Sequence, residues 1–137
     1  MSSPLVERGT PHYVLMDHKE RIGPKVGLLH DGGSCLAIYG FSDKQPYEEF
    51  CKNSSLALTP YPLVKFYLQN QVDEGEQRFK LVILDAIDPN ADTLYAATMH
   101  DALEAHIHGR KTVPVSYQLD FDKAKSEYRV LESTLVA

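Results

Sequence analysis

The sequence predicts an α+β fold, in which a mixed and mainly antiparallel sheet carries helices mainly on one face. Two observations support this fold class. Paired apolar runs around a short polar turn occur near both ends of the chain, as in antiparallel hairpins. Between them, a strand, two helices and a further strand allow one parallel crossover. The expected order is strand–strand–strand–helix–helix–strand–helix–strand–strand (β-β-β-α-α-β-α-β-β).

Length and composition indicate one domain. The chain has 137 residues, of which 43% are hydrophobic and 24% are charged, as in an average globular protein. We expect a flexible N-terminus over residues 1–10, which are mostly polar, and a single α+β domain over residues 11–137. Apolar runs such as Leu81–Leu84 are far shorter than the roughly 18–20 residues of a membrane span. The first eight residues also lack the basic-then-apolar order of a secretory signal, so we expect a cytoplasmic location and no membrane contact.

The first strands are expected around a glycine turn. Tyr13–Met16 is a short apolar run between a proline and an aspartate, which favours a strand. Further along, the apolar runs Val26–Leu29 and Cys35–Phe41 flank the sequence Asp31-Gly32-Gly33. Because glycine supplies the positive φ angles of tight hairpin turns, these two runs are predicted to pair as a hairpin.

Two helices are expected next. In the first, Asp43 offers a capping side chain and Pro46 suits the first turn. Its apolar stripe consists of Tyr47, Phe50 and Cys51. The second helix is expected to open at Thr59-Pro60 in the same way. One face of it would carry Leu63, Phe66, Tyr67 and Asn70.

The strongest strand prediction is Phe79–Leu84, because an unbroken apolar run is typical of a central strand covered on both faces. A helix is expected from Asp92 to His108, with Asp92 as its cap and Gly109 as its stop. Its buried stripe would consist of Tyr95, Met99, Ala102, Leu103, His106 and Ile107. The segment Thr93–Met99 also fits a strand, so both assignments stay open there.

Alternation of apolar and polar residues over Val113–Phe121 predicts a strand with one solvated face. After a polar turn, Tyr128–Leu135 is expected to return as a second strand. The succession of a helix, Val113-Pro114 and a hairpin resembles the closing half of the thioredoxin family. A thioredoxin-like α/β fold without a redox motif is therefore the alternative, since the two cysteines, Cys35 and Cys51, form no CxxC pair.

The charge distribution argues against two classes of partner. Residues 1–70 carry seven basic and seven acidic side chains, whereas residues 71–137 carry seven basic and twelve acidic ones, so the second half holds the whole net charge of −5. Binding to nucleic acid depends largely on basic side chains that neutralise phosphates. We therefore expect neither nucleic acid nor an anionic membrane surface as a partner.

Asp85 and His106 are the candidate catalytic residues. Asp85 ends the buried strand predicted at Phe79–Leu84, before a helix, where acidic residues of phosphoryl-transfer sites lie. His106 falls on the apolar side of the helix expected over 92–108, and a histidine paired with a carboxylate can act as a general base near neutral pH. The structural alternatives are a turn residue for Asp85 and a hydrogen-bonded core histidine for His106.

The candidate metal ligands lie on the other side of the same helix. His100, Glu104 and His108 recur every four residues and therefore share one face, and imidazole and carboxylate are ligand types of zinc and iron. At 1.5 Å rise per residue, neighbouring members stand about 6 Å apart, so His100 and His108 are too far apart to share one ion. The candidate pair is His100 with Glu104, and a solvated helix face is the alternative.

The remaining motifs are incomplete. Residues 30–34 contain serine, histidine and aspartate, but a catalytic triad needs these groups to converge in space, which a hairpin turn seldom provides. The run at 88–92 matches the first half of a calcium loop, yet the later key positions are Thr93 and Met99 instead of glycine and glutamate. Phosphate-binding glycine loops are absent, so no cofactor is predicted.

These observations favour a small binding or protein-interaction module that acts as a homo-oligomer. An exposed sheet edge can pair across a two-fold axis, and the hairpin at 113–135 is the expected place for it. The first alternative is a small enzyme or small-molecule binder with a pocket near Asp85 and His106. The second is a metal-binding protein that uses His100 and Glu104.

Overall fold

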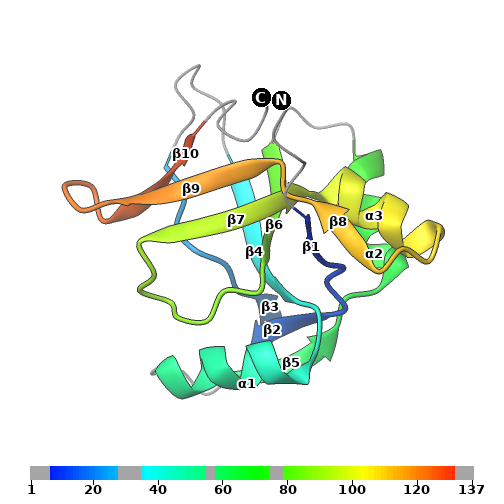
Figure 1. The fold of residues 1–137 in the computed structure, drawn as a ribbon, viewed down its shortest axis with the longest axis horizontal. Helices are drawn as coiled ribbons and strands as arrows, with labels where there is room; N and C mark the ends of the chain where they lie inside the picture. The colour runs from blue at the N-terminus through cyan, green and yellow to red at the C-terminus, as the bar shows by residue number, and fades with distance from the viewer. Residues whose placement is uncertain (1–6, 28–34, 55–57, 75–78, 132–137) are drawn as a thin grey trace.

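The computed structural model describes residues 7–27, 35–54, 58–74 and 79–131. Over these residues the chain is a mixed α+β fold with a mainly antiparallel sheet and three helices, as predicted (Figure 1). Within the same ranges, no helix is long and apolar enough to cross a lipid bilayer.

An eight-stranded sheet forms the centre of the molecule. Its strands are β2 Tyr13–Asp17, β3 Glu20–Arg21, β4 Cys35–Phe41, β5 Thr59–Pro62, β6 Phe79–Leu84, β7 Thr93–Thr98, β9 Tyr117–Asp122 and β10 Glu127–Leu131. They follow the order β10-β9-β7-β6-β4-β2-β3, and β5 pairs with β2. Among these pairs, β4 with β6 is parallel and the others are antiparallel.

The parallel pair places the ends of two distant segments together. The chain leaves β4, passes through α1 (Lys44–Asn53), β5 and α2 (Lys65–Asp73), and returns as β6. The register runs from Cys35 opposite Phe79 to Gly40 opposite Leu84. Because parallel strands end at the same edge of a sheet, the residues that follow β4 and β6 become neighbours.

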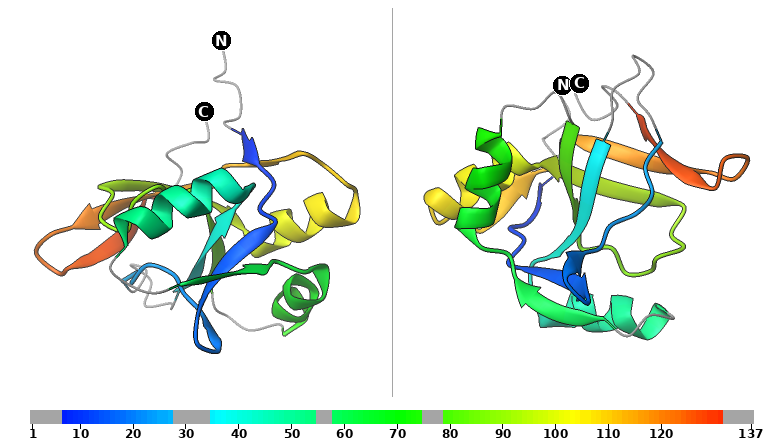
Figure 2. Two further views of the ribbon diagram at one scale, coloured as in Figure 1. Left: turned by 90° about the horizontal axis from the view of Figure 1, so that it is seen from below. Right: turned by 180° about the vertical axis from the view of Figure 1, so that it is seen from behind.

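Apolar side chains form two clusters, and β6 contributes to both. Val82 and Leu84 belong to one, and Leu81 and Ile83 belong to the other. All four are at most 4% exposed, so the strand is covered on both faces over Leu81–Leu84. Helices α2 and α3 (Met99–Ile107) contact each other, whereas α1 lies apart from them against β2 and β4 (Figure 2).

The N-terminal residues pair with a strand far along the sequence. β1 (Glu7–Gly9) and β8 (Thr112–Pro114) form a separate two-stranded antiparallel sheet. Thr10 is 1% exposed, and its hydroxyl donates to the carbonyl of Arg110 at 2.7 Å. Residues 7–10, which belong to the segment that we expected to be flexible, are thus bonded to β8 and to the two residues before it. Residues 1–6 lie outside the described residues.

The predicted hairpin of Val26–Leu29 with Cys35–Phe41 does not form in the described part of the chain. Strand β4 pairs with β6 along one edge, and at its other edge Gly40 and Phe41 pair with β2 while the amide of Tyr39 donates to Ile22. Val26 forms a parallel bridge with Tyr128 of β10 instead. The glycine turn itself lies outside the described residues.

The first predicted helix is confirmed, but the second begins later than expected. Asp43 caps α1, because its carboxylate accepts a hydrogen bond from the amide of Lys44 at 2.8 Å. Thr59-Pro60, which we expected to open a helix, lies in β5 and pairs with β2. The edge of β2 captures this segment, so α2 starts at Lys65 and Phe66 is 75% exposed.

The open assignment at Thr93–Met99 resolves as a strand followed by a helix. Residues 93–98 form β7, which fills the space between β6 and β9. Thr98, and not Asp92, caps α3, because its hydroxyl accepts from the amide of Asp101 at 3.0 Å. Gly109 follows the helix at a φ of 62°, as expected for its stop.

The C-terminal strands differ from the prediction in one respect. Tyr117–Asp122 and Glu127–Leu131 pair antiparallel, as expected of a hairpin. Val113, however, belongs to β8 and pairs with Arg8. The run that we predicted as a single strand from Val113 to Phe121 is therefore divided between two sheets.

Candidate functional site

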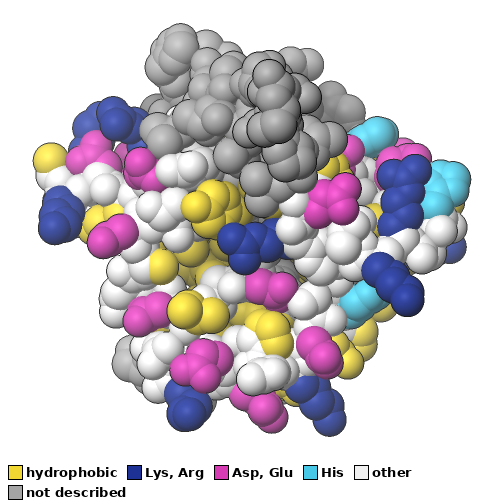
Figure 3. All heavy atoms as spheres, in the orientation of Figure 1, with side chains coloured by type: hydrophobic (Ala, Val, Ile, Leu, Met, Phe, Trp, Pro, Cys, Tyr) yellow, Lys and Arg dark blue, Asp and Glu magenta, His cyan; other side chains and the backbone are white. Residues whose placement is uncertain are grey.

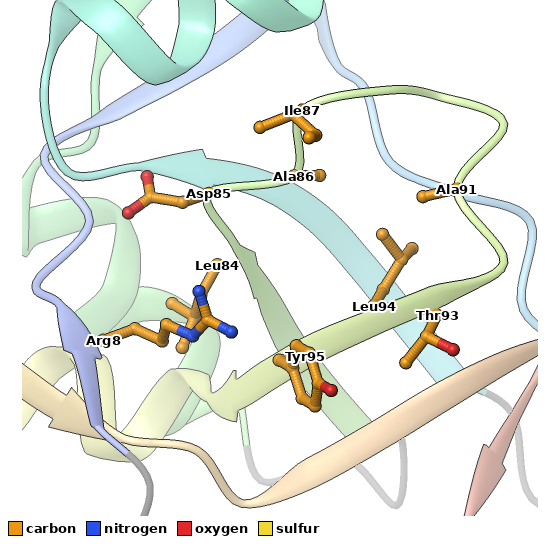
Figure 4. Close-up of a pocket in the computed structure, with 9 residues that line it drawn as sticks. All are labelled: Arg8, Leu84, Asp85, Ala86, Ile87, Ala91, Thr93, Leu94 and Tyr95. Carbon is orange, nitrogen blue, oxygen red and sulfur yellow. The ribbon is translucent and has the colours of Figure 1, made fainter.

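A pocket opens at the carboxyl end of β6, one of the two parallel strands. Its volume is about 240 Å³. The residues that line it are Arg8, Leu84, Asp85, Ala86, Ile87, Ala91, Thr93, Leu94 and Tyr95 (Figure 4). They come from β1, from the end of β6 with the loop that follows it, and from β7. The space-filling view shows apolar and charged side chains together in the middle of the face that carries β1 and β7 (Figure 3).

Asp85 joins the ends of β4 and β6. Its carboxylate accepts hydrogen bonds from the amide of Ser42 at 2.7 Å and from the hydroxyl of Ser42 at 2.8 Å. Its own amide donates to the carbonyl of Gly40 at 2.9 Å. The backbone of Asp85 has a φ of 49°, a left-handed conformation that aspartate tolerates better than most residues. Three hydrogen bonds thus hold this candidate residue at the wall of the pocket.

Arg8 supplies the positive charge of the pocket. Its guanidinium lies over the ring of Tyr95, 5.0 Å from the ring centroid. Figure 4 shows the side chain reaching from β1 toward the residues of β6 and β7. Arg8 is exposed and forms no ion pair with a carboxylate of the described residues. Its charge is therefore available to a ligand.

The neighbours of Arg8 in the chain fix its position. A Cβ atom on Gly9 would stand 2.6 Å from the Cβ of Ser42, so only glycine permits this close approach. The amide of Thr10 donates to the carbonyl of Lys111 at 3.0 Å. Together with the β1–β8 pairing, these contacts anchor the strand that carries the guanidinium.

His106 lies next to a second histidine and outside the lining of this pocket. Its Nε2 is 2.8 Å from the carbonyl oxygen of Pro11, and its ring centroid is 5.3 Å from that of His12. Because a carbonyl only accepts, Nε2 carries the proton of this hydrogen bond. Partial burial and the neighbouring His106 lower the pKa of His12, while Asp43 acts in the opposite direction. The structure therefore gives Asp85 and His106 different partners.

The two candidate metal ligands also have different partners. The side chain of His100 is 65% exposed, and its Nδ1 is 3.9 Å from a carboxylate oxygen of Asp101. Glu104 faces His108, with 3.3 Å between the carboxylate oxygen and Nε2. Over the described ranges, no group of three or more histidine, cysteine, aspartate and glutamate side chains is arranged to hold a metal ion.

The loop between β6 and β7 forms one wall of the pocket and is tied to β10. The hydroxyl of Tyr128 donates to the carbonyl of Ala91. Within the loop, the amide of Asn90 donates to the carboxylate of Asp88 at 2.7 Å. Burial raises the pKa of Tyr128, and the negative charges of Asp92 and Asp88 add to the shift. The acidic run at 88–92 thus shapes the loop that forms this wall.

Of the nine residues that line the pocket, the sequence analysis named only Asp85 as a candidate site residue. The polar and aromatic lining residues that it missed are Arg8, Thr93 and Tyr95. Arg8 was assigned to a flexible segment, and nothing local to residues 1–10 reveals that β8 pairs with it. The sequence did indicate a strand at Thr93 and Tyr95, because threonine and tyrosine favour strands and a strand was one of the two assignments left open there.

Neither a protein-family model, nor a curated protein, nor a solved structure matches the chain.

Proposed function

We propose that the chain is a binding protein, and that its ligand is a small organic molecule held in the pocket at the end of β6. The observation that supports this is the composition of the lining, in which one cationic side chain stands beside an apolar surface. Binding sites for small molecules combine an apolar wall with few, well-placed polar groups. The carboxyl edge of parallel strands is also a common place for such sites.

The size of the pocket limits the ligand. Its volume of about 240 Å³ lies below the roughly 300–1,000 Å³ of sites for drug-sized molecules. The ligand is therefore smaller than a typical drug, on the scale of one substituted ring or a short chain.

A fragment screen tests the binding proposal, with binding followed by the NMR signals of the backbone amides. We expect fragments at about millimolar concentration to shift the signals of Asp85–Ile87 and Thr93–Tyr95, since such weak affinity is usual for small ligands. The variant Ala91→Phe fills the pocket from its wall and should abolish these shifts. Ala124→Phe makes the same change at an exposed site in the β9–β10 turn and should preserve them.

Two outcomes would contradict the proposal. One is a screen in which no fragment moves the signals of the lining residues. The other is a set of shifts that Ala91→Phe leaves unchanged, because the fragments would then bind elsewhere.

Self-association through the C-terminal hairpin is the second candidate. β10 is the last strand in the order of the sheet, which favours pairing with a second copy. Part of its outer edge is occupied, since the amide of Tyr128 donates to Lys25 and its carbonyl accepts from Gly27. In an antiparallel pair, alternate residues point the same way, so Val130 offers the next outward amide.

Sedimentation velocity at about 100 µM tests the second candidate, because this exceeds the roughly 1 µM dissociation constant of an ordinary homodimer. A dimer that Val130→Pro converts to monomer would support pairing at β10, since proline lacks the amide. A monomer at this concentration would rule it out.

A further inference from the structure

We infer that the ligand carries one negative charge, on a carboxylate or a similar oxyanion group, and binds it through the Arg8 guanidinium. This inference rests on the proposed binding function and adds the chemical class of the ligand. It follows from the contrast between the two charged residues of the lining. Arg8 forms no ion pair with any described carboxylate, whereas the Asp85 carboxylate already accepts two hydrogen bonds from Ser42.

The contact of Arg8 with Tyr95 leaves the donors of the guanidinium available. A cation over an aromatic ring presents the flat face of the group to the ring. The N–H groups of a guanidinium point outward in its plane and match the two oxygens of a carboxylate. With the centroid of Tyr95 at 5.0 Å, the ring orients the guanidinium without consuming its hydrogen bonds.

The position of Arg8 is set before any ligand binds. The β1–β8 register places Arg8 opposite Val113, and the next residue, Gly9, lies against Ser42. Thr10 then fastens the chain to the backbone of Arg110 and Lys111. A cation held in this way loses little freedom on binding, which favours recognition of an anion.

The rest of the lining restricts the ligand to one charge and an apolar body. The apolar lining residues are Leu84, Ala86, Ile87, Ala91 and Leu94. An anion placed away from Arg8 would meet this surface, where a charge loses its hydration without a partner. A second anionic group would also face the carboxylate of Asp85, which lies in the same lining.

A set of three probes of nearly identical shape tests the inference: benzoate, benzamide and benzamidine. They are anionic, neutral and cationic at pH 7. Titrations followed by backbone amide signals should give an affinity for benzoate at least about ten-fold above that for benzamide, the usual size of a charge-assisted hydrogen bond. Benzamidine should bind more weakly than benzamide.

Three variants assign the preference to Arg8. Arg8→Gln should bring the affinity for benzoate down to that for benzamide, whereas Arg8→Lys should retain part of the preference. Arg129→Gln removes the same charge from an exposed position on β10 outside the lining and should leave the preference intact. Equal losses in Arg8→Gln and Arg129→Gln would overturn the inference, because net charge alone would then explain them.

The outcomes separate this inference from the proposed function. If benzamide and benzamidine shift the signals of the lining residues as strongly as benzoate, the pocket binds small molecules and the assignment of an anion is wrong. If none of the three probes, and no fragment of the screen, shifts these signals, the proposed function itself fails.

Discussion

Asp85 combines a side-chain role and a backbone role at one position. Its carboxylate holds Ser42 at the end of β4, and its left-handed backbone turns the chain out of β6. The sequence identified this residue by its place after an apolar run. It did not reveal that Ser42 is its partner, because the two residues are 43 positions apart.

Substitutions at Asp85 should separate these two roles. Asp85→Ala removes both hydrogen bonds to Ser42. It also places alanine, which has no polar side chain to bond locally, in the left-handed backbone region. We therefore expect the free energy of unfolding to fall by about 2–4 kcal/mol. Asp85→Asn tolerates the same backbone and keeps an acceptor, and should cost less than half as much. Urea unfolding measures both values. Equal costs for the two variants would contradict this account.

His12 should titrate below the ordinary histidine pKa of 6.5. Partial burial and the neighbouring His106 lower its pKa, and Asp43 opposes them. The pKa of His12, measured from its ring signals by NMR, should therefore rise in His106→Gln and fall further in Asp43→Asn.

The effect on stability has a definite sign. Because the unfolded chain takes up the proton first, the contribution of His12 to stability is present above pH 6.5 and declines as the pH falls through that value toward the folded pKa. A His12 pKa at or above 6.5 in the folded protein would disprove the assignment.

At the scale of single elements, local sequence patterns predicted a segment correctly where its structure did not depend on which strand it pairs with. Cys35–Phe41 and Phe79–Leu84 are strands with the predicted bounds. Local patterns failed where the segment pairs with the edge of a distant strand. Thr59-Pro60 is an example: its threonine and proline suit the start of a helix, but the segment pairs with β2. A free edge offers a whole row of hydrogen bonds, which outweighs a capping preference of about 1 kcal/mol.

Strand β1 carries Arg8, the cationic residue of the pocket. Gly9→Ala would press a Cβ atom against the Cβ of Ser42, and such overpacking costs about 1–3 kcal/mol. We also expect the amide signals of Arg8 and Asp85 to move, since the strand must shift to relieve the contact. Urea unfolding and amide spectra measure the two effects.

Gly109→Ala is the matched control for this substitution. Its Cβ atom would meet nothing within 4 Å, and its cost is the strain of a left-handed alanine, about 1–2 kcal/mol. It should leave the signals of Arg8 and Asp85 in place. If Gly9→Ala also leaves them in place, β1 does not position the pocket.

At the scale of the whole molecule, the segment after β3 connects the two ends of the sheet. The segment after β3 passes along β4, where Ile22 accepts from the amide of Tyr39, and reaches β10 at Tyr128. The same Tyr128 is bonded through its hydroxyl to Ala91 in the wall of the pocket. One buried tyrosine therefore links the end of the sheet to the candidate site.

Removal of the Tyr128 hydroxyl should destabilise the protein. Tyr128→Phe loses the hydrogen bond to Ala91 and should lower the free energy of unfolding by about 1 kcal/mol at pH 7. The pKa of Tyr128 is raised above 10.0 in the folded protein, so its contribution is complete below pH 10 and is lost as the pH rises through the folded pKa. Unfolding monitored between pH 7 and 11 should show a smaller alkaline loss in the variant. An identical alkaline loss in both proteins would contradict the assignment.

The sequence by itself determined the fold class, the central strand Phe79–Leu84, the capped helix after Asp43 and the position of Asp85. Each of these depends on residues close together in the chain, whose apolar spacing and capping side chains act locally. Only the tertiary structure decided that Arg8 stands over Tyr95, that Thr59-Pro60 forms a strand and that Asp85 and His106 take different partners. These contacts join segments far apart in the sequence, and which edge a segment pairs with depends on the space that the other strands leave free.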